Sequence, residues 1–262
     1  MAFSTSTAVL LVVLGFGVGS FGTLVGAGGG FILTPVLLVL YPHDSPQTIS
    51  AISIAVVFFN AASGSVAYAR QRRIDYRSGL IFGAATLPGA VVGAIAVTHV
   101  SRRFFDAVMV AVLLGIAAWL LGGDRLRREP RTGPEGARQV PLVKGAVLSL
   151  IVGFVSSFLG IGGGIIHVPL MIQALGFPVH IATATSHFVL AIMSGAATVT
   201  HLVQGSYHVG HGLRRTLSLS AGVIVGAQLG ARVSTRVTGR TIQRLLVVAI
   251  LALSVRLIFT LV

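Results

Sequence analysis

The sequence predicts an all-α polytopic membrane protein, and three observations lead to this fold class. Hydrophobic residues make up 54% of the 262 residues, and mean hydropathy is +0.93. Only 10% of the residues are charged, against about 25% in a soluble domain, so the chain has too little polar surface to face water on all sides. Apolar runs recur along the whole chain without the polar alternation of β-barrel strands, which favours membrane helices.

Each apolar run is expected to form a helix. The N-terminal run has no Lys or Arg before its apolar part, so it is interpreted as the first membrane segment and not as a signal peptide. The runs at 30–41 and 164–175 have only about 12 residues and are expected to be partial segments buried in protein, which leaves about eight full spans. In order, the expected segments are 7–25, 30–41, 48–69, 78–98, 104–122, 143–159, 164–175, 181–203, 213–231 and 241–261.

A charged stretch rich in Gly and Pro, residues 123–142, interrupts this series. Its composition is typical of a solvent-exposed linker. We therefore expect an N-terminal transmembrane repeat at 1–122, a linker loop at 123–142 and a C-terminal transmembrane repeat at 143–262.

The charge pattern indicates a lipid bilayer as the partner and excludes nucleic acid. Net charge is +13, but nearly all basic residues lie between apolar runs, as topology signals at a membrane face do. The chain has no cysteine, so thiol redox chemistry and cysteine-based sites are excluded. Two loop histidines, His208 and His211, lack a third ligand for a metal. We expect a multi-pass protein of the plasma (inner) membrane that is not an enzyme and holds no metal or cofactor.

The two groups of segments repeat one another. VGAGGGFILTPVL at 25–37 matches LGIGGGIIHVPLM at 159–171. Duplicated halves with interrupted helices are a common transporter design. Parallel and inverted halves both stay open, but inversion gathers more Lys and Arg on one face, which the positive-inside rule favours. The matched positions are Gly26, Gly28, Gly29, Gly30 and Pro35 with Gly160, Gly162, Gly163, Gly164 and Pro169, then Ser50, Ser53, Gly79, Gly89 and Gly93 with Thr183, Ser186, Gly212, Gly222 and Gly226.

At the repeated Gly-Gly-Gly-x₄-Pro element the sequence resembles the TauE/SafE family of sulfite and organosulfonate exporters. The resemblance covers nearly the whole chain and includes ATATSHF at 182–188 and the glycine-spaced PGAVVGA at 88–94. It implies a secondary transporter that exports small sulfur-containing oxyanions such as sulfite or organosulfonates. SAISIAV at 50–56 departs from the family's threonine-serine pattern, so the two halves are not expected to contribute equally.

The glycine runs are expected to interrupt helices at membrane depth. Such backbone is tolerated only where protein or a water-filled cavity surrounds it. Helices that restart near Phe31 and Ile165 would present unpaired N–H groups and the positive ends of two dipoles, which hold an anion without Lys or Arg. The alternative is close helix packing, which explains Gly89, Gly93, Gly222, Gly226 and Gly230. The candidate substrate-binding residues of this element are Gly28, Gly29, Gly30, Pro35, Gly162, Gly163, Gly164 and Pro169.

Polar side chains within the spans are the second set of candidates, because such groups are costly in a membrane. Hydroxyl groups can donate to sulfonate or sulfite oxygens, although they also bond to the preceding helical turn. All six carboxylates fall in loops or at segment ends, so a histidine is the expected carrier of any coupled proton. The alternative for His167 is a neutral histidine bonded to backbone. The candidates are Ser53, Asn60, His167, Thr185, Ser186 and His187.

Three functions remain open from the residues alone. The first is an anion transporter that works by alternating access around a midplane site at the repeat interface. The second is an anion-selective channel that uses the same dipoles, and a transporter of another small organic anion is a further alternative. A membrane enzyme is disfavoured because buried carboxylates and a metal cluster are missing from the pattern. The exact anion, the direction, the coupling ion and assembly as a homodimer stay open.

Overall fold

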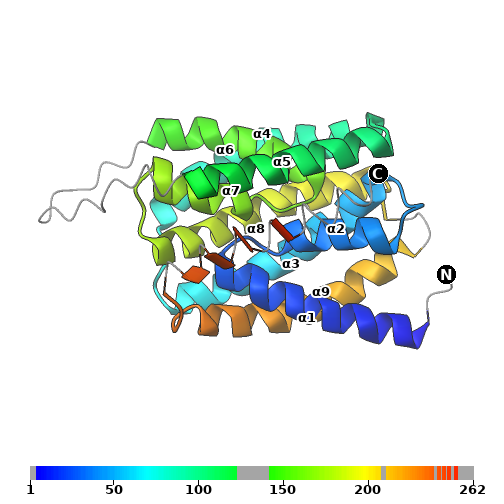
Figure 1. Ribbon diagram of the computed structural model, residues 1–262, viewed down its shortest axis with the longest axis horizontal. Coiled ribbons are helices and arrows are strands. Elements are labelled where there is room, and N and C mark those ends of the chain that lie inside the picture. Colours follow the sequence, from blue (N-terminus) through cyan, green and yellow to red (C-terminus); the bar gives the residue numbers. More distant parts are fainter. Residues whose placement is uncertain are drawn as a thin grey trace, which may run out of the picture.

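The computed structural model describes residues 4–122, 142–207, 211–238 and part of 241–252, and the regular elements in these ranges are helical. The expected linker and most of the expected last segment lie outside the described residues. The elements are α1 (Thr5–Val25), α2 (Gly30–Leu40), α3 (Pro46–Arg70), α4 (Tyr76–Ala96), η1 (Val97–His99), α5 (Arg102–Gly122), α6 (Leu142–Leu159), α7 (Gly164–Pro169), the π-helical η3 (Leu170–Ala174), α8 (Val179–Val203) and α9 (Gly212–Val233) (Figure 1).

Six of the described helices are long and apolar enough to cross a membrane: α1, α3, α4 with η1, α6, α8 and α9. Each helix begins and ends within one turn of the boundary expected from the sequence. The two short segments, α2 and α7 with η3, are those that the sequence predicts to be partial. The chain is therefore an all-α polytopic protein, while the expected number of eight spans stays a prediction.

Local signals explain where the two helices after α2 begin. The Ser45 side chain accepts a hydrogen bond from the backbone N–H of Thr48, and Pro46 occupies the first turn of α3. Asp75 accepts from the N–H of Ser78 and caps α4. A side-chain oxygen at the N-cap and a proline in the first turn both satisfy or remove N–H groups that lack intrahelical partners.

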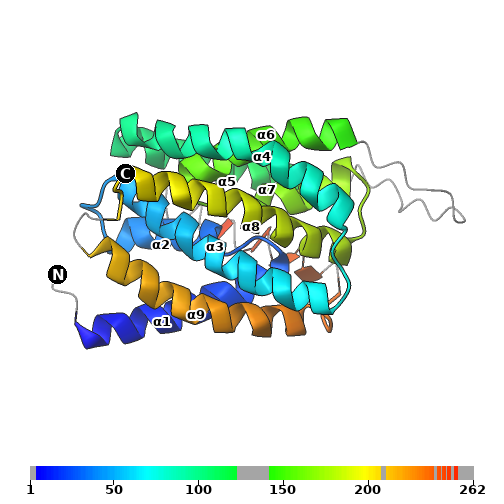
Figure 2. The ribbon, with the colours of Figure 1, turned by 180° about the vertical axis from the view of Figure 1, so that it is seen from behind.

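The helices pack in two close pairs around a central pair. α1 lies along α9, and α4 lies along α6 (Figures 1 and 2). Between these pairs, α3 packs against α9, α8 packs against α4, and α3 and α8 pack against each other. A Cβ atom on Gly222 of α9 would meet the carbonyl oxygen of Val12, and one on Gly89 of α4 would meet that of Leu150. Glycine therefore sets the close approach of these pairs, as small residues do between membrane helices.

Helices at corresponding places before and after the stretch at 123–142 run in opposite directions. In Figure 1, α1 and α3 run from the right of the view to the left, while α6 and α8 run from left to right. Figure 2 shows the same opposition from behind. α4 and α9 are likewise opposed. One end of the bundle therefore carries the α3–α4 connection and the end of α9, and we call it the arginine end. The arginines of these segments, with the adjoining turns of α3 and α4, are Arg70, Arg72, Arg73, Arg77, Arg232 and Arg236.

The opposite end holds paired charges, and we call it the ion-pair end. Arg215 at the start of α9 pairs with Asp44 in the α2–α3 connection. The Arg215 guanidinium also lies 3.7 Å from the centre of the Tyr41 ring. On α5, Arg102 pairs with Asp106 at 3.0 Å. The Arg215 contacts tie the start of α9 to the α2–α3 connection, whereas the Arg102–Asp106 pair lies within α5.

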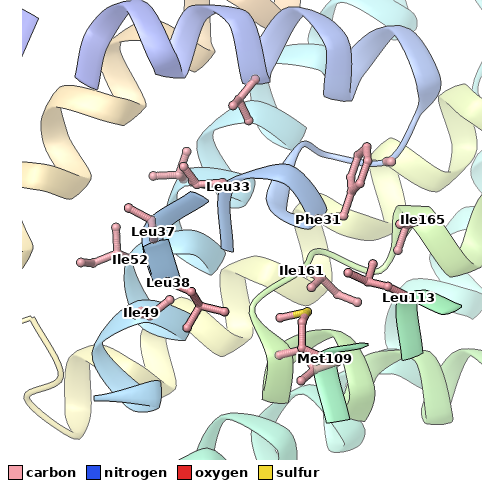
Figure 3. Close-up of a cluster of buried hydrophobic side chains, with 14 of the residues drawn as sticks. Phe31, Leu33, Leu37, Leu38, Ile49, Ile52, Met109, Leu113, Ile161 and Ile165 are labelled. Carbon is pink, nitrogen blue, oxygen red and sulfur yellow. The ribbon is translucent and has the colours of Figure 1, made fainter. Parts of the chain in front are cut away.

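A cluster of buried apolar side chains covers the short segments. Figure 3 shows Met109 and Leu113 of α5 beside Ile161 and Ile165, while Ile49 and Ile52 of α3 lie beside Leu37 and Leu38 of α2. Phe31 of α2 and Met109 and Leu113 of α5 are fully buried there, as are Ile161 and Ile165. The interrupted backbone is thus surrounded by protein, which is the condition for irregular backbone at membrane depth.

Candidate functional site

Both glycine runs interrupt a helix in the structure. α1 ends at Val25 and α2 begins at Gly30, while α6 ends at Leu159 and α7 begins at Gly164. The two restarts lie one residue before the positions that the sequence predicts. The turns use left-handed backbone, which glycine adopts without a steric cost. The left-handed residues are Gly26 (φ 77°), Gly28 (φ 75°), Gly29 (φ 78°), Gly160 (φ 67°) and Gly162 (φ 65°).

The two turns cross each other backbone to backbone in the interior. A Cβ atom on Gly30 would lie 2.6 Å from the carbonyl carbon and oxygen of Ile161. A Cβ atom on Gly164 would meet the carbonyl oxygen of Gly26 and lie 2.6 Å from the Cα of Ala27. All residues of both turns are buried. Close packing therefore accounts for Gly30 and Gly164, which is the alternative that the sequence left open for this element.

The remaining glycines of the runs face side chains. A Cβ atom on Gly28 would lie 3.3 Å from Val57 of α3 and would also meet Leu190 of α8. A Cβ atom on Gly162 would lie 2.8 Å from Val57. Gly163 has an ordinary helical φ of −58°, and its Cβ would lie 2.9 Å from the Ser156 hydroxyl oxygen. Val57 and Leu190 thus mark the point where α3 and α8 pass the crossing.

Hydroxyl groups satisfy the carbonyl groups at the broken helix ends. Ser53 donates to the Gly160 carbonyl at 2.6 Å, and Thr34 lies 2.8 Å from the same oxygen. Ser186 donates to the Gly26 carbonyl at 3.4 Å. Buried carbonyl groups of this kind need such partners. Ser53 and Ser186, two of the candidate binding residues, therefore lie at the crossing with their hydrogens directed to backbone. Thr34 also lies there and was missed in the sequence analysis.

The N-termini of α2 and α7, which lie at the crossing, have no side-chain cap. Gly29 and Gly163 are the N-cap residues of α2 and α7, and neither offers a side-chain hydrogen bond to the first turn. α7 continues directly into η3, so the second restarted segment is Gly164–Ala174. First-turn N–H groups carry the positive end of the helix dipole. Pro35 and Pro169 lie within these restarted segments.

A chain of hydrogen bonds lies one turn from the crossing. His187 Nε2 is 3.2 Å from the Thr23 hydroxyl oxygen, and that hydroxyl donates to Asn60 Oδ1 at 3.1 Å. The Tyr68 hydroxyl donates to the Thr23 carbonyl at 2.7 Å. Thr23, Asn60 and His187 are fully buried, and Asn60 Nδ2 has no hydrogen-bond partner. Asn60 and His187 are candidate binding residues from the sequence, which gave no signal for Thr23 or Tyr68.

Two predicted residues lie apart from the crossing. Thr185 accepts a hydrogen bond from the backbone N–H of Asp75 at the start of α4. His167 is fully buried, with Nε2 3.0 Å from the Ser149 hydroxyl oxygen and its ring 5.9 Å from that of Phe82. His167 is thus a core histidine that contacts a side-chain hydroxyl, whereas the alternative expected from the sequence was a histidine bonded to backbone. Within the described ranges, no three His, Asp or Glu side chains gather where a metal ion could bind; His208 lies outside those ranges.

Comparison with known proteins identifies the family. The model of the family described as "Sulfite exporter TauE/SafE" matches residues 11–257. The chain belongs to the TauE/SafE family. This TauE/SafE protein is 29% identical over 275 residues to the probable membrane transporter protein YunE of Bacillus subtilis, with 96% of this chain and 97% of YunE aligned. It is 27% identical to the probable membrane transporter protein ORF9 of Sinorhizobium sp, over 95% of this chain and 91% of ORF9.

A third relative is the probable membrane transporter protein MJ0441 of Methanocaldococcus jannaschii, 26% identical over 77% of this chain and 76% of that protein. No solved structure matches the chain. Family membership and the six apolar helices make this TauE/SafE protein a multi-pass membrane transporter, which in a bacterium lies in the plasma membrane.

Proposed function

We propose that this protein exports small sulfur-containing oxyanions, such as sulfite or organosulfonates, and that the anion binds at the crossing of the two glycine turns. The observation that carries the proposal is the pair of uncapped restarts, α2 and α7, whose turns meet backbone to backbone inside the bundle. Helix N-termini supply N–H donors and a positive dipole end, and thus a site for an anion without Lys or Arg. A movement that parts the two turns exposes these groups to the solute.

The packing supports two inverted halves, 1–122 and 143–262, joined by the linker at 123–142. In the sequence match, α1 corresponds to α6 and α9 corresponds to α4. The α1–α9 pair therefore corresponds to the α6–α4 pair. Ser53 on the Gly160 carbonyl likewise corresponds to Ser186 on the Gly26 carbonyl. Inverted repeats around a midplane site are the basis of alternating access in many transporters. Proton coupling and a homodimer stay predictions.

Transport by purified protein in proteoliposomes tests this function. We expect saturable uptake of sulfite or methanesulfonate and weaker uptake of acetate, compared with and without a pH gradient. Gly163→Val places a side chain against Ser156 and Val152 at the start of α7. We expect at least about tenfold slower flux, because the loss of one charge-assisted hydrogen bond to the anion has an effect of about this size.

Gly17→Val is the matched control, because a Cβ atom at Gly17 meets nothing within 4 Å. Flux that rises without saturation would support the channel alternative. Uptake of acetate in preference to both sulfur anions would support the other organic anions instead. Gly163→Val protein that folds and transports at the wild-type rate would contradict the binding site at the crossing.

A further inference from the structure

The Asn60 amide turns its oxygen toward Thr23. The Thr23 hydroxyl has one hydrogen, and it donates that hydrogen to Asn60 Oδ1. His187 Nε2 therefore carries the hydrogen that lies between the ring and Thr23. The chain runs from His187 through Thr23 to Asn60, and the Asn60 Nδ2 amino group is its free end. Burying an amide donor without a partner costs free energy, so such a group in a native structure calls for an explanation.

Neighbouring groups hold this chain in place. The Tyr68 ring packs edge-on against the His187 imidazole, with 5.6 Å between ring centres, and the Tyr68 hydroxyl binds the Thr23 carbonyl. Gly64 leaves room for the imidazole, since a Cβ atom there would lie 2.6 Å from His187 Cδ2. The Asn60 amide oxygen is thus held toward Thr23, in an arrangement with Nδ2 unpartnered.

The free donor lies beside the crossing on the side of the arginine end. Asn60 follows Val57 by one turn of α3, and a Cβ atom on either Gly30 or Gly162 would contact Val57. Residues three apart on a helix share a face, so Asn60 and Val57 point toward the same region. α3 runs toward the arginine end, which places Asn60 between that end and the crossing (Figure 1).

The corresponding place in the second half is apolar. By the sequence match, Met193 stands where the first half has Asn60, and Ile54 stands where α8 has His187. Met193 packs in a buried cluster with Ile54, Ala90, Ala94 and Ala197. Ser156 and Ser157 carry buried hydroxyls without partners near this flank, but a helical hydroxyl can rotate to the carbonyl of the preceding turn. The anchored Asn60 amide has no such freedom.

We propose that Asn60 Nδ2 is a specificity-determining donor for the transported anion, and that Thr23 and His187 are positioning residues that aim it. This inference rests on the proposed function, and it places the specificity-determining donor in the first half of the sequence. The Asn60 amide offers a donor of fixed direction at this point, so it favours a solute with an unprotonated oxygen, as in a sulfonate. A spherical anion of equal charge, such as bromide, gains less from a donor of fixed direction, because selection of this kind depends on a matched hydrogen bond.

Binding to the purified full-length protein tests this assignment, with methanesulfonate and bromide as probes in calorimetric titrations. We expect Asn60→Leu to weaken methanesulfonate binding about tenfold, the typical effect of one lost hydrogen bond to a charged group, and to change bromide binding less than about twofold. Met193→Leu is the matched control at the corresponding position and is expected to leave both affinities within about twofold.

Two substitutions of Thr23 distinguish the orientation of the Asn60 amide from side-chain packing. Thr23→Val keeps the shape but removes the hydroxyl that anchors Asn60, so methanesulfonate affinity is expected to fall several-fold, whereas Thr23→Ser keeps the hydroxyl and is expected to restore it. This pair decides the question if Asn60→Leu does not fold. Wild-type methanesulfonate affinity in folded Asn60→Leu, or equal losses in Thr23→Val and Thr23→Ser, would overturn the inference alone. Failure of wild-type protein to bind either methanesulfonate or sulfite would overturn the proposed function as well.

Discussion

The Gly160 carbonyl has two hydroxyl partners, whereas its counterpart in the first half has one. Ser53 and Thr34 both lie within 2.8 Å of the Gly160 oxygen, but Ser186 is 3.4 Å from the Gly26 oxygen. A hydrogen bond of 2.6 Å is well formed, while one of 3.4 Å is close to the limit. The second turn is therefore held more firmly to α2 and α3 than the first turn is to α8.

A double-mutant cycle measures this difference. Ser53→Ala and Thr34→Val each leave Gly160 with one donor, so each is expected to lower the free energy of unfolding by about 1 kcal/mol. The double variant leaves a buried carbonyl bare and is expected to lose about 1–3 kcal/mol beyond the sum of the two. Thermal unfolding in detergent provides the measurement. Ser186→Ala is the control and should change stability less than Ser53→Ala; purely additive losses would show that the two hydroxyls do not share this carbonyl.

At the scale of elements, glycines set how closely the helices approach. In α9, a Cβ atom on Gly222 would meet the Val12 carbonyl oxygen and lie 2.6 Å from the Phe16 amide nitrogen. Backbone atoms cannot yield as a flexible side chain does. Gly222→Ala is therefore expected to push α9 from α1 and to lower the free energy of unfolding by about 1–3 kcal/mol, the usual cost of overpacking.

Gly17 on α1 provides the matched control for that variant. It is exposed, and a Cβ atom there meets nothing within 4 Å. Gly17→Ala should raise stability by about 0.5–1 kcal/mol, because alanine loses less backbone entropy in a helix. Equal melting temperatures for Gly222→Ala and Gly17→Ala would contradict the role assigned to the α1–α9 contact.

Much of the element pattern could be predicted from the sequence, because glycine runs and apolar lengths act locally. The breaks at Gly26–Gly29 and Gly160–Gly163 follow from residues within those runs. The crossing of the two turns could not be derived in this way, since it depends on how α3 and α8 bring distant backbone together. The local sequence pattern determines where a helix ends, whereas tertiary packing determines what the end of the helix contacts.

The candidate site was predicted in part, and the misses have a geometric cause. Thr185 and Ser186 were both expected at the site, but successive residues point about 100° apart on a helix. Ser186 reaches the Gly26 carbonyl, so Thr185 faces α4 and bonds to Asp75. Thr23 was missed because a single threonine in an apolar helix forms no recognisable sequence pattern. Its role depends on contacts with Asn60 and His187 from other helices.

At the scale of the whole molecule, the two ends of the bundle differ in charge. Asp44 and Asp106 pair with Arg215 and Arg102 at one end. The arginine end carries six arginines on the α3–α4 connection, α4 and the end of α9, with Asp75 as the carboxylate that caps α4. Unbalanced basic residues mark the cytoplasmic side of a membrane protein. The arginine end is therefore expected to face the cytoplasm, so that an exported anion enters past these charges, which attract it.

The absence of cysteine from the sequence allows a direct test of this orientation and of the inverted halves. Four exposed arginines serve as positions for single cysteines: Arg77 and Arg236 at the arginine end, and Arg103 and Arg214 at the ion-pair end. With a membrane-impermeant maleimide applied outside intact cells, we expect labelling of Arg103→Cys and Arg214→Cys and protection of the other two until the membrane is opened. Parallel halves would instead move the positions of the second half to the opposite faces. Labelling of Arg103→Cys with Arg236→Cys, and protection of Arg214→Cys with Arg77→Cys, would therefore refute the inverted arrangement.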